Sequence, residues 1–157
     1  MPLENFTTPV VTGISTHFLT ATAAARHMVK RGSGVILTLS SSAAGLSGRD
    51  ESYHSTGGFG VACGAIEHLT RVLAGQLGPK GIRVVCMRSD ALPETWQHQF
   101  EGQAESPFTY MTAGTVLRRM PKIQEVAEAA AFAASDRASA MTGTIFNLTC
   151  GSVLDKD

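Results

Sequence analysis

The sequence predicts an α/β fold, a partial parallel sheet with flanking helices, in a single domain of 157 residues. Three observations support this prediction. Stretches with helical periodicity alternate along the chain with short aliphatic runs. These runs lack in–out alternation, which is typical of strands buried on both faces of a parallel sheet. No internal repeat or linker divides the chain, so the order of helices and strands indicates crossover connections within one sheet.

Three helices are predicted from apolar residues that recur every three or four positions. The first covers residues 8–31 and ends before Gly32. The second covers residues 58–77 and ends at the turn sequence GPKG. The third covers residues 122–135 and follows Pro121, a residue that suits a helix start.

The predicted strands are 34–40, 82–87 and 144–149. Residues 41–58 are rich in Ser and Gly and are predicted to form a loop. Residues 89–116 are predicted to be irregular, with a short helix over 95–103 that acts as a flap. Three strands are fewer than the usual four to six, so we expect part of the sheet to be missing.

Composition excludes several classes of protein. Hydrophobic residues make up 43% and charged residues 17%, and the net charge is zero, which indicates a globular protein without a field for nucleic acid or anionic membranes. No apolar run spans a membrane and no leader is visible, so we expect a cytoplasmic protein. The cysteines are isolated and are expected to be free thiols, and no metal-ligand cluster occurs.

Three segments, in this order, carry a family resemblance: GSGVILTLSSSAAG, LTRVLAGQLGPKGIRVVCMRSDALPET and LRRMPKIQEVAEAAAFAASDRASAMTGTIFNLTCG. They resemble the short-chain dehydrogenase/reductase family from its fifth strand and serine loop to its last helix and strand. The resemblance implies a Rossmann-like sheet. In full-length members it also implies NAD(P)-dependent hydride transfer between a nicotinamide and a carbonyl or alcohol.

The same resemblance implies where the family's catalytic serine, tyrosine, lysine and asparagine fall: Ser42, Phe59, Cys63 and Gly13. Phe59 has no proton to donate, and Cys63 has neither the reach nor the charge of lysine, so we expect both in the core. The family's Pro-Gly beside the nicotinamide is replaced by Ser89-Asp90. Loss of a positioned acid/base group costs about 10²–10⁴-fold in rate, so the site is predicted to be incompetent.

The glycine-rich turn that holds the cofactor pyrophosphate in this family has no match, and neither do the family's first four strands. We therefore expect a truncated domain over residues 1–157 in which no residue is assigned to cofactor binding. The isolated chain is expected to bind no cofactor. NAD(P) remains the expected cofactor if a partner chain supplies the missing segment.

Three functions remain open. The first is a non-catalytic module that forms a homo-oligomer through residues 8–31 and 58–77, through the exposed strand 34–40, or through both. The second is an NAD(P)-dependent oxidoreductase active with a partner chain or by an atypical mechanism. The third is a decayed fragment without a selected role. A substitute acid/base at Tyr53 or His54 is disfavoured, and the helical histidines 17, 27 and 68 are interpreted as surface or interface residues.

Overall fold

The computed structural model describes residues 1–46, 57–96 and 107–155. Its centre is a parallel sheet with the strand order β1-β2-β3. The strands are β1 (Gly34–Ser41), β2 (Ile82–Ser89) and β3 (Ile145–Leu148). β1 and β2 pair along their full lengths, so both end at the same edge of the sheet, where Ser41 lies opposite Ser89. The predicted Rossmann-like partial sheet is confirmed.

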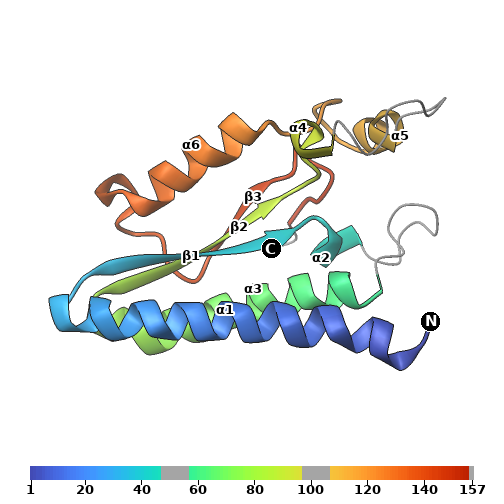
Figure 1. Cartoon of the computed structure of the whole chain (residues 1–157). Coiled ribbons are helices and arrows are strands. Elements are labelled where there is room, and N and C mark those ends of the chain that lie inside the picture. The colour runs from blue at the N-terminus through green and yellow to red at the C-terminus, as the bar shows by residue number, and fades with distance from the viewer. Residues whose placement is uncertain (47–56, 97–106, 156–157) are drawn as a thin grey trace.

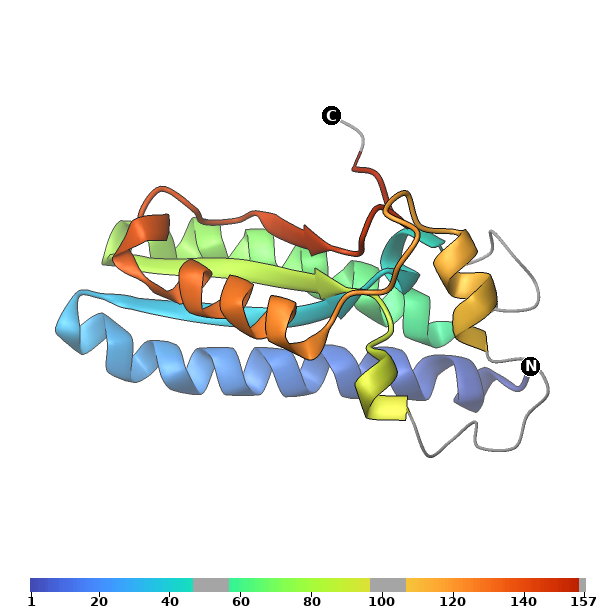
Figure 2. The same cartoon turned by 90° about the horizontal axis from the view of Figure 1, so that it is seen from above.

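Helices cover the two faces of the sheet unequally (Figure 1). The long helices α1 (Leu3–Arg31) and α3 (Gly58–Leu77) lie on one face, and α6 (Ile123–Ala134) lies on the other. Seen from above, α1 runs along the β1 side of the sheet (Figure 2), and α3 packs against β1 and β2. The shorter helices are α2 (Ala43–Leu46), α4 (Pro93–Trp96), α5 (Pro107–Ala113), η1 (Gly78–Lys80) and η2 (Asp136–Ala138).

The core divides into two layers on either side of β2. Between the sheet and the two long helices, Ala21 and Ala25 of α1 and Leu73 of α3 pack against Ile36 and Val84. On the opposite face, a smaller cluster forms between β2, α6 and β3. Its fully buried members are Val85, Met87 and Ala133. β2 is therefore buried on both faces, as its continuous aliphatic sequence predicts.

β1 differs from this prediction. Its residues alternate, with Ile36, Thr38 and Ser40 buried toward the helices, while Leu37 and Leu39 are 37% and 59% exposed. The expectation that β1 is buried on both faces is wrong for the described residues. The hydrophobic cluster on that face is formed mainly by side chains of β2, β3 and α6 and includes none from β1, which leaves Leu37 and Leu39 partly exposed.

The helix predictions are confirmed with shifted ends. α1 begins five residues earlier than predicted and contains Pro9, whose missing N–H removes one hydrogen bond without ending the helix. It ends as predicted at Gly32, which adopts a left-handed conformation (φ 71°) and donates its N–H to the Val29 carbonyl. α3 matches its prediction, and α6 is one residue shorter at each end.

The segments predicted as irregular contain short helices that lack a long apolar period. α2 lies within the predicted 41–58 loop, and α5 lies within the predicted 89–116 segment. The flap helix begins at Pro93 instead of residue 95, and its remainder lies outside the described residues, as do Tyr53 and His54. Across 1–46, 57–96 and 107–155, no helix is long and apolar enough to cross a membrane.

Candidate functional site

A pocket of about 260 Å³ lies beyond the carboxyl ends of β1 and β2, the edge at which parallel α/β sheets bind ligands. The start of α3, residues 90–96 and Met111 of α5 form the rest of its described walls. The described lining residues are Ser41, Ser42, Ala43, Phe59, Asp90, Ala91, Leu92, Thr95, Trp96 and Met111. Three residues singled out in the sequence, Ser42, Phe59 and Asp90, therefore meet in one place with Trp96 from the predicted flap, whereas Ser89 is not among the described lining residues.

Ser42 lies where β1 turns into α2. Its backbone N–H donates to the Ser89 carbonyl at 2.8 Å, which extends the β1–β2 pairing by one residue. Its hydroxyl donates to Oδ1 of Asp90 at 2.9 Å, and the residue is 7% exposed. The Ser42 proton is thus engaged by a buried carboxylate on the neighbouring strand end.

The hydroxyl of the adjacent residue, Ser41, faces α3 instead. The Cys63 thiol lies 3.7 Å from Ser41 Oγ, and the Ala43 N–H donates to the same oxygen at 3.1 Å. Sequence reasoning selected Ser42 and missed Ser41. Three serines follow one another, and Ser41 lies one position beyond the predicted strand 34–40 although it is the last residue of β1, so the sequence offered no signal that singles it out.

Phe59 and Cys63 occupy successive turns of α3, at i and i+4 on one face. Cys63 is 3% exposed and belongs to the interior, as predicted. Phe59 is 49% exposed and lines the pocket, so the expectation that it lies in the core is wrong. Its position in the first turn of α3, beside the open pocket, keeps it out of the helix–sheet contact.

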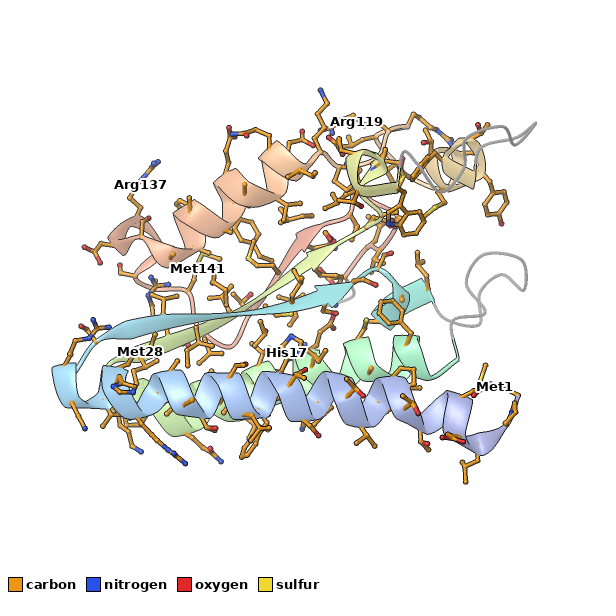
Figure 3. All side chains as sticks on the ribbon, viewed as in Figure 1. Met1, His17, Met28, Arg119, Arg137 and Met141 are labelled. Carbon is orange, nitrogen blue, oxygen red and sulfur yellow. The ribbon has the colours of Figure 1, made fainter. Side chains whose placement is uncertain are left out.

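Gly13 lies at the contact between α1 and α3 and does not line this pocket. A Cβ atom there would lie 3.4 Å from the Ala62 Cβ, so glycine allows the two helices to approach. The Gly13 carbonyl accepts a hydrogen bond from Nδ1 of His17 at 2.8 Å. His17 lies between α1 and the sheet (Figure 3), and its Nε2 accepts the Leu39 N–H at 3.4 Å.

Asp90 is 7% exposed and is the one ionisable group among the described lining residues. Oδ1 accepts the Ser42 hydroxyl and the Ala91 N–H, the latter at 2.8 Å. Oδ2 accepts the hydroxyl of Ser152, from the segment after β3. Hydrogen bonds from three residues hold the carboxylate in one orientation at the pocket wall.

A buried ion pair lies beside this site and was missed by sequence reasoning. Arg88 Nε and Nη2 donate to the two carboxylate oxygens of Glu67, each at 2.7 Å, and the Ser40 hydroxyl donates to the same carboxylate at 2.9 Å. Arg88 also contacts Asp155. Hydrogen bonding to Glu67 raises the pKa of the Arg88 guanidinium. The available signal was an arginine directly after the apolar run VVCM of the central strand, since a buried arginine requires a charged partner.

The described residues fit neither a metal ion nor a dinucleotide cofactor. No group of three or more His, Cys, Asp or Glu side chains in the described part of the chain could hold a metal ion. A dinucleotide needs a strand that leads through glycines to the N-terminus of a helix. β1 leads to α2 and β2 leads to α4, each of four residues. The residues described after β1 and β2 therefore do not fit a pyrophosphate cradle.

Comparison with known proteins finds one family over nearly the whole chain. Residues 1–152 match the family model described as "Enoyl-(Acyl carrier protein) reductase". The chain is 30% identical to the 7alpha-hydroxysteroid dehydrogenase of Escherichia coli (strain K12), over 98% of this chain and 57% of that protein. The chain belongs to the short-chain dehydrogenase/reductase family. An uncharacterized oxidoreductase of Thermotoga maritima is 34% identical over 95% of this chain and 59% of its own length.

Solved structures agree with this assignment to the short-chain dehydrogenase/reductase family. A structure of 7 alpha-hydroxysteroid dehydrogenase with NADH and 7-oxo glycochenodeoxycholic acid superposes with a TM-score of 0.80 at 29% identity, covering 99% of this chain and 58% of that one. A short chain dehydrogenase/reductase family protein gives a TM-score of 0.77 at 29% identity, covering 96% and 59%. The chain thus spans somewhat more than half the length of these relatives.

Proposed function

We propose that this chain is a pseudoenzyme of the short-chain dehydrogenase/reductase family, without dehydrogenase activity on its own, that acts as an oligomerising or binding module. One observation carries the proposal. Phe59, at the family's tyrosine position, lines the pocket, and Cys63, at the lysine position, is buried behind it. The pocket therefore keeps its place in the fold while its proton donor is replaced by a hydrocarbon ring.

The chemical argument concerns the proton that accompanies hydride transfer to a carbonyl. A phenol at position 59 would supply that proton, and an ammonium at position 63 would lower the phenol pKa. A phenyl ring supplies none, and a buried thiol carries no positive charge. Each positioned acid/base group is worth about 10²–10⁴-fold in rate, so the loss of both removes useful turnover.

Exposed apolar residues on α1 and α3 support the oligomerisation part of the proposal. They are Val11 (62%), Phe18 (49%) and Leu19 (64%) on α1, and Val61 (48%) and Val72 (41%) on α3. Val11 and Phe18 are seven positions apart and so lie on one face of α1, and exposed apolar surface marks interaction sites on soluble proteins. We propose that the two helices pack against their copies in a second chain, which would remove these side chains from water.

The edge strand β1 offers a second surface. Leu37 and Leu39 are exposed on its outer face, and a groove of about 260 Å³ runs between β1 and α1, past His17 and Met28. An unpaired strand edge is a template for another strand. We propose that a strand from a second polypeptide covers this edge.

The test uses the full chain, with the E. coli 7alpha-hydroxysteroid dehydrogenase as the positive control. Oxidation of NADH and NADPH is followed with a panel of carbonyl compounds, and the molar mass is measured by light scattering during gel filtration. We expect no turnover and a mass of at least two chains. Turnover by the purified chain would refute the pseudoenzyme, and a monomer at micromolar concentration would refute the oligomer.

A second candidate is an NAD(P)-dependent oxidoreductase that is active when a partner chain supplies the cofactor segment. It is favoured by the position of the pocket at the strand ends and by the similarity to the NADH-containing steroid dehydrogenase structure. Thermal unfolding of the chain with 1 mM NADH or NADPH tests whether it binds a cofactor without that partner, and no shift would leave the two-chain enzyme open. A cofactor that binds with a Kd of about 100 μM would stabilise the fold by about 1.4 kcal/mol, which would favour this candidate.

A further inference from the structure

The pocket at the strand ends combines one buried carboxylate with aromatic walls. Asp90 supplies the carboxylate, and Phe59 and Trp96 supply the rings. Met111 and Leu92 add apolar surface, and no Lys, Arg or His is among the described lining residues. The described part of the lining is therefore negative and apolar at once, a combination that selects organic cations over neutral or anionic molecules.

The Asp90 carboxylate is already held in place by Ser42, Ser152 and its own Ala91 N–H. A ligand that binds there meets a carboxylate that is already fixed in place, so binding does not have to order this side chain. Because the Asp90 carboxylate is itself buried, the attraction of an ammonium for it is stronger than it would be for a carboxylate on an open surface.

Nearby arginines are engaged by other carboxylates and do not neutralise Asp90. Arg88 pairs with Glu67 and Asp155, and Arg119 pairs with Glu125. Among the described lining residues, Asp90 is therefore the one charged group that a ligand in this pocket would contact.

The aromatic walls are suited to a cation as well as to an apolar group. Phe59 is half exposed at the start of α3. Trp96 is backed by Phe108 of α5, with ring centroids 5.8 Å apart and a tilt of 43°. Ring faces attract ammonium groups within about 6 Å, and tryptophan does so most strongly.

We propose that this pocket binds a small organic cation, an amine that carries an apolar or aromatic group. Its ammonium lies at Asp90 and its apolar part lies against Phe59 and Trp96. The volume of about 260 Å³ is at the small end of ligand pockets and suits a single-ring amine. This inference deepens the proposed function, on which it rests, because it names the ligand class of the binding module.

The test follows the fluorescence of Trp96, the one tryptophan in the sequence, during titration at pH 7. Three probes of similar size and different charge are compared: benzylamine, benzyl alcohol and benzoate. We expect benzylamine to bind at least tenfold more tightly than benzyl alcohol, and benzoate not to bind. Equal affinities for the three probes would overturn the inference.

Variants connect the charge preference to the pocket. Asp90→Asn should bring benzylamine and benzyl alcohol to within threefold of each other, whereas the matched control Asp136→Asn, an exposed aspartate at the opposite end of the sheet, should keep the tenfold preference. An unchanged preference in Asp90→Asn overturns the inference.

If circular dichroism shows that Asp90→Asn is unfolded, Phe59→Leu replaces it, since Phe59 is half exposed. We expect this variant to bind benzylamine at least threefold more weakly, and an unchanged affinity would overturn the inference. Turnover with NADH or NADPH would refute the proposed function without altering these probe affinities, so the two failures are distinguishable.

Discussion

Arg88 on β2 and Glu67 on α3 form a bidentate ion pair in which both residues are only 6% exposed. The pair joins the central strand to the helix that passes beneath it, and the Ser40 hydroxyl on β1 donates to the same carboxylate. Three elements of the fold therefore meet at one buried charge. Arg88 also contacts Asp155, which ties the segment after β3 to the sheet.

We expect Glu67→Leu to destabilise the fold by about 3–5 kcal/mol, because it leaves the Arg88 guanidinium buried without its bidentate partner. The double variant Glu67→Leu/Arg88→Met should lose much less than the sum of the two single variants, because it removes both charges together. Urea unfolding of the four proteins measures this coupling. Additive losses would contradict the view that the pair acts as a unit.

Gly81 is expected to tolerate no side chain. It adopts φ 77° in the turn before β2, and a Cβ there would lie 2.1 Å from the Gly32 carbonyl oxygen. Gly81→Ala should therefore lower the free energy of unfolding by more than about 1 kcal/mol. Gly75→Ala is the matched control, because that helical position has no atom within 4 Å of a Cβ, and it should stabilise α3 by about 0.5–1 kcal/mol. Equal effects would contradict the geometry.

The sequence predicted the elements whose burial is periodic or continuous. α3 and β2 follow directly from their apolar patterns, because their environments are set by the long helix–sheet contact. β1 was predicted less well. Its composition resembles that of β2, yet Leu37 and Leu39 are exposed. Composition records how apolar a strand is and does not reveal which neighbours cover it.

The site was predictable in position and less so in detail. The order of the motifs placed Ser42, Phe59 and Asp90 at the same strand ends, and the structure brings them together. The direction of each side chain required coordinates. Ser41 faces Cys63 while Ser42 faces Asp90, and three consecutive serines carry no pattern that distinguishes these roles. The contact of Ser152 with Asp90 joins residues 62 positions apart, which no local spacing could predict.

Glu125 provides a pH-dependent contact at the start of α6. Its carboxylate accepts two hydrogen bonds from Arg119 at 2.7 Å and one from the Lys122 N–H at 3.0 Å. These bonds, those from Arg119 first, lower the pKa of Glu125 from 4.5 to about 2. Because the folded-state pKa is depressed, the contribution of Glu125 to stability is present above about pH 4.5 and is lost as the pH falls toward 2.

A carboxyl-carbon NMR titration checks this assignment. Arg119→Gln should return the pKa of Glu125 toward its ordinary value, whereas Arg118→Gln should leave it near 2, since Arg118 donates instead to the Ala113 carbonyl. An equal shift in both variants would show that the general positive charge near α6, and not the Arg119 hydrogen bonds, sets the pKa.

The two proposed association surfaces make opposite predictions for two exposed apolar residues. Phe18 on α1 is 49% exposed and Leu39 on β1 is 59% exposed, on different faces of the molecule. If the helices form the homodimer interface, Phe18→Glu should raise its dissociation constant at least tenfold, because each charge would be buried against an apolar face. Leu39→Glu should leave that dissociation constant unchanged. Sedimentation of both variants over a range of concentrations measures the effect. If Leu39→Glu dissociates the homodimer and Phe18→Glu does not, the interface lies at the β1 edge, where the Leu39 N–H donates to His17.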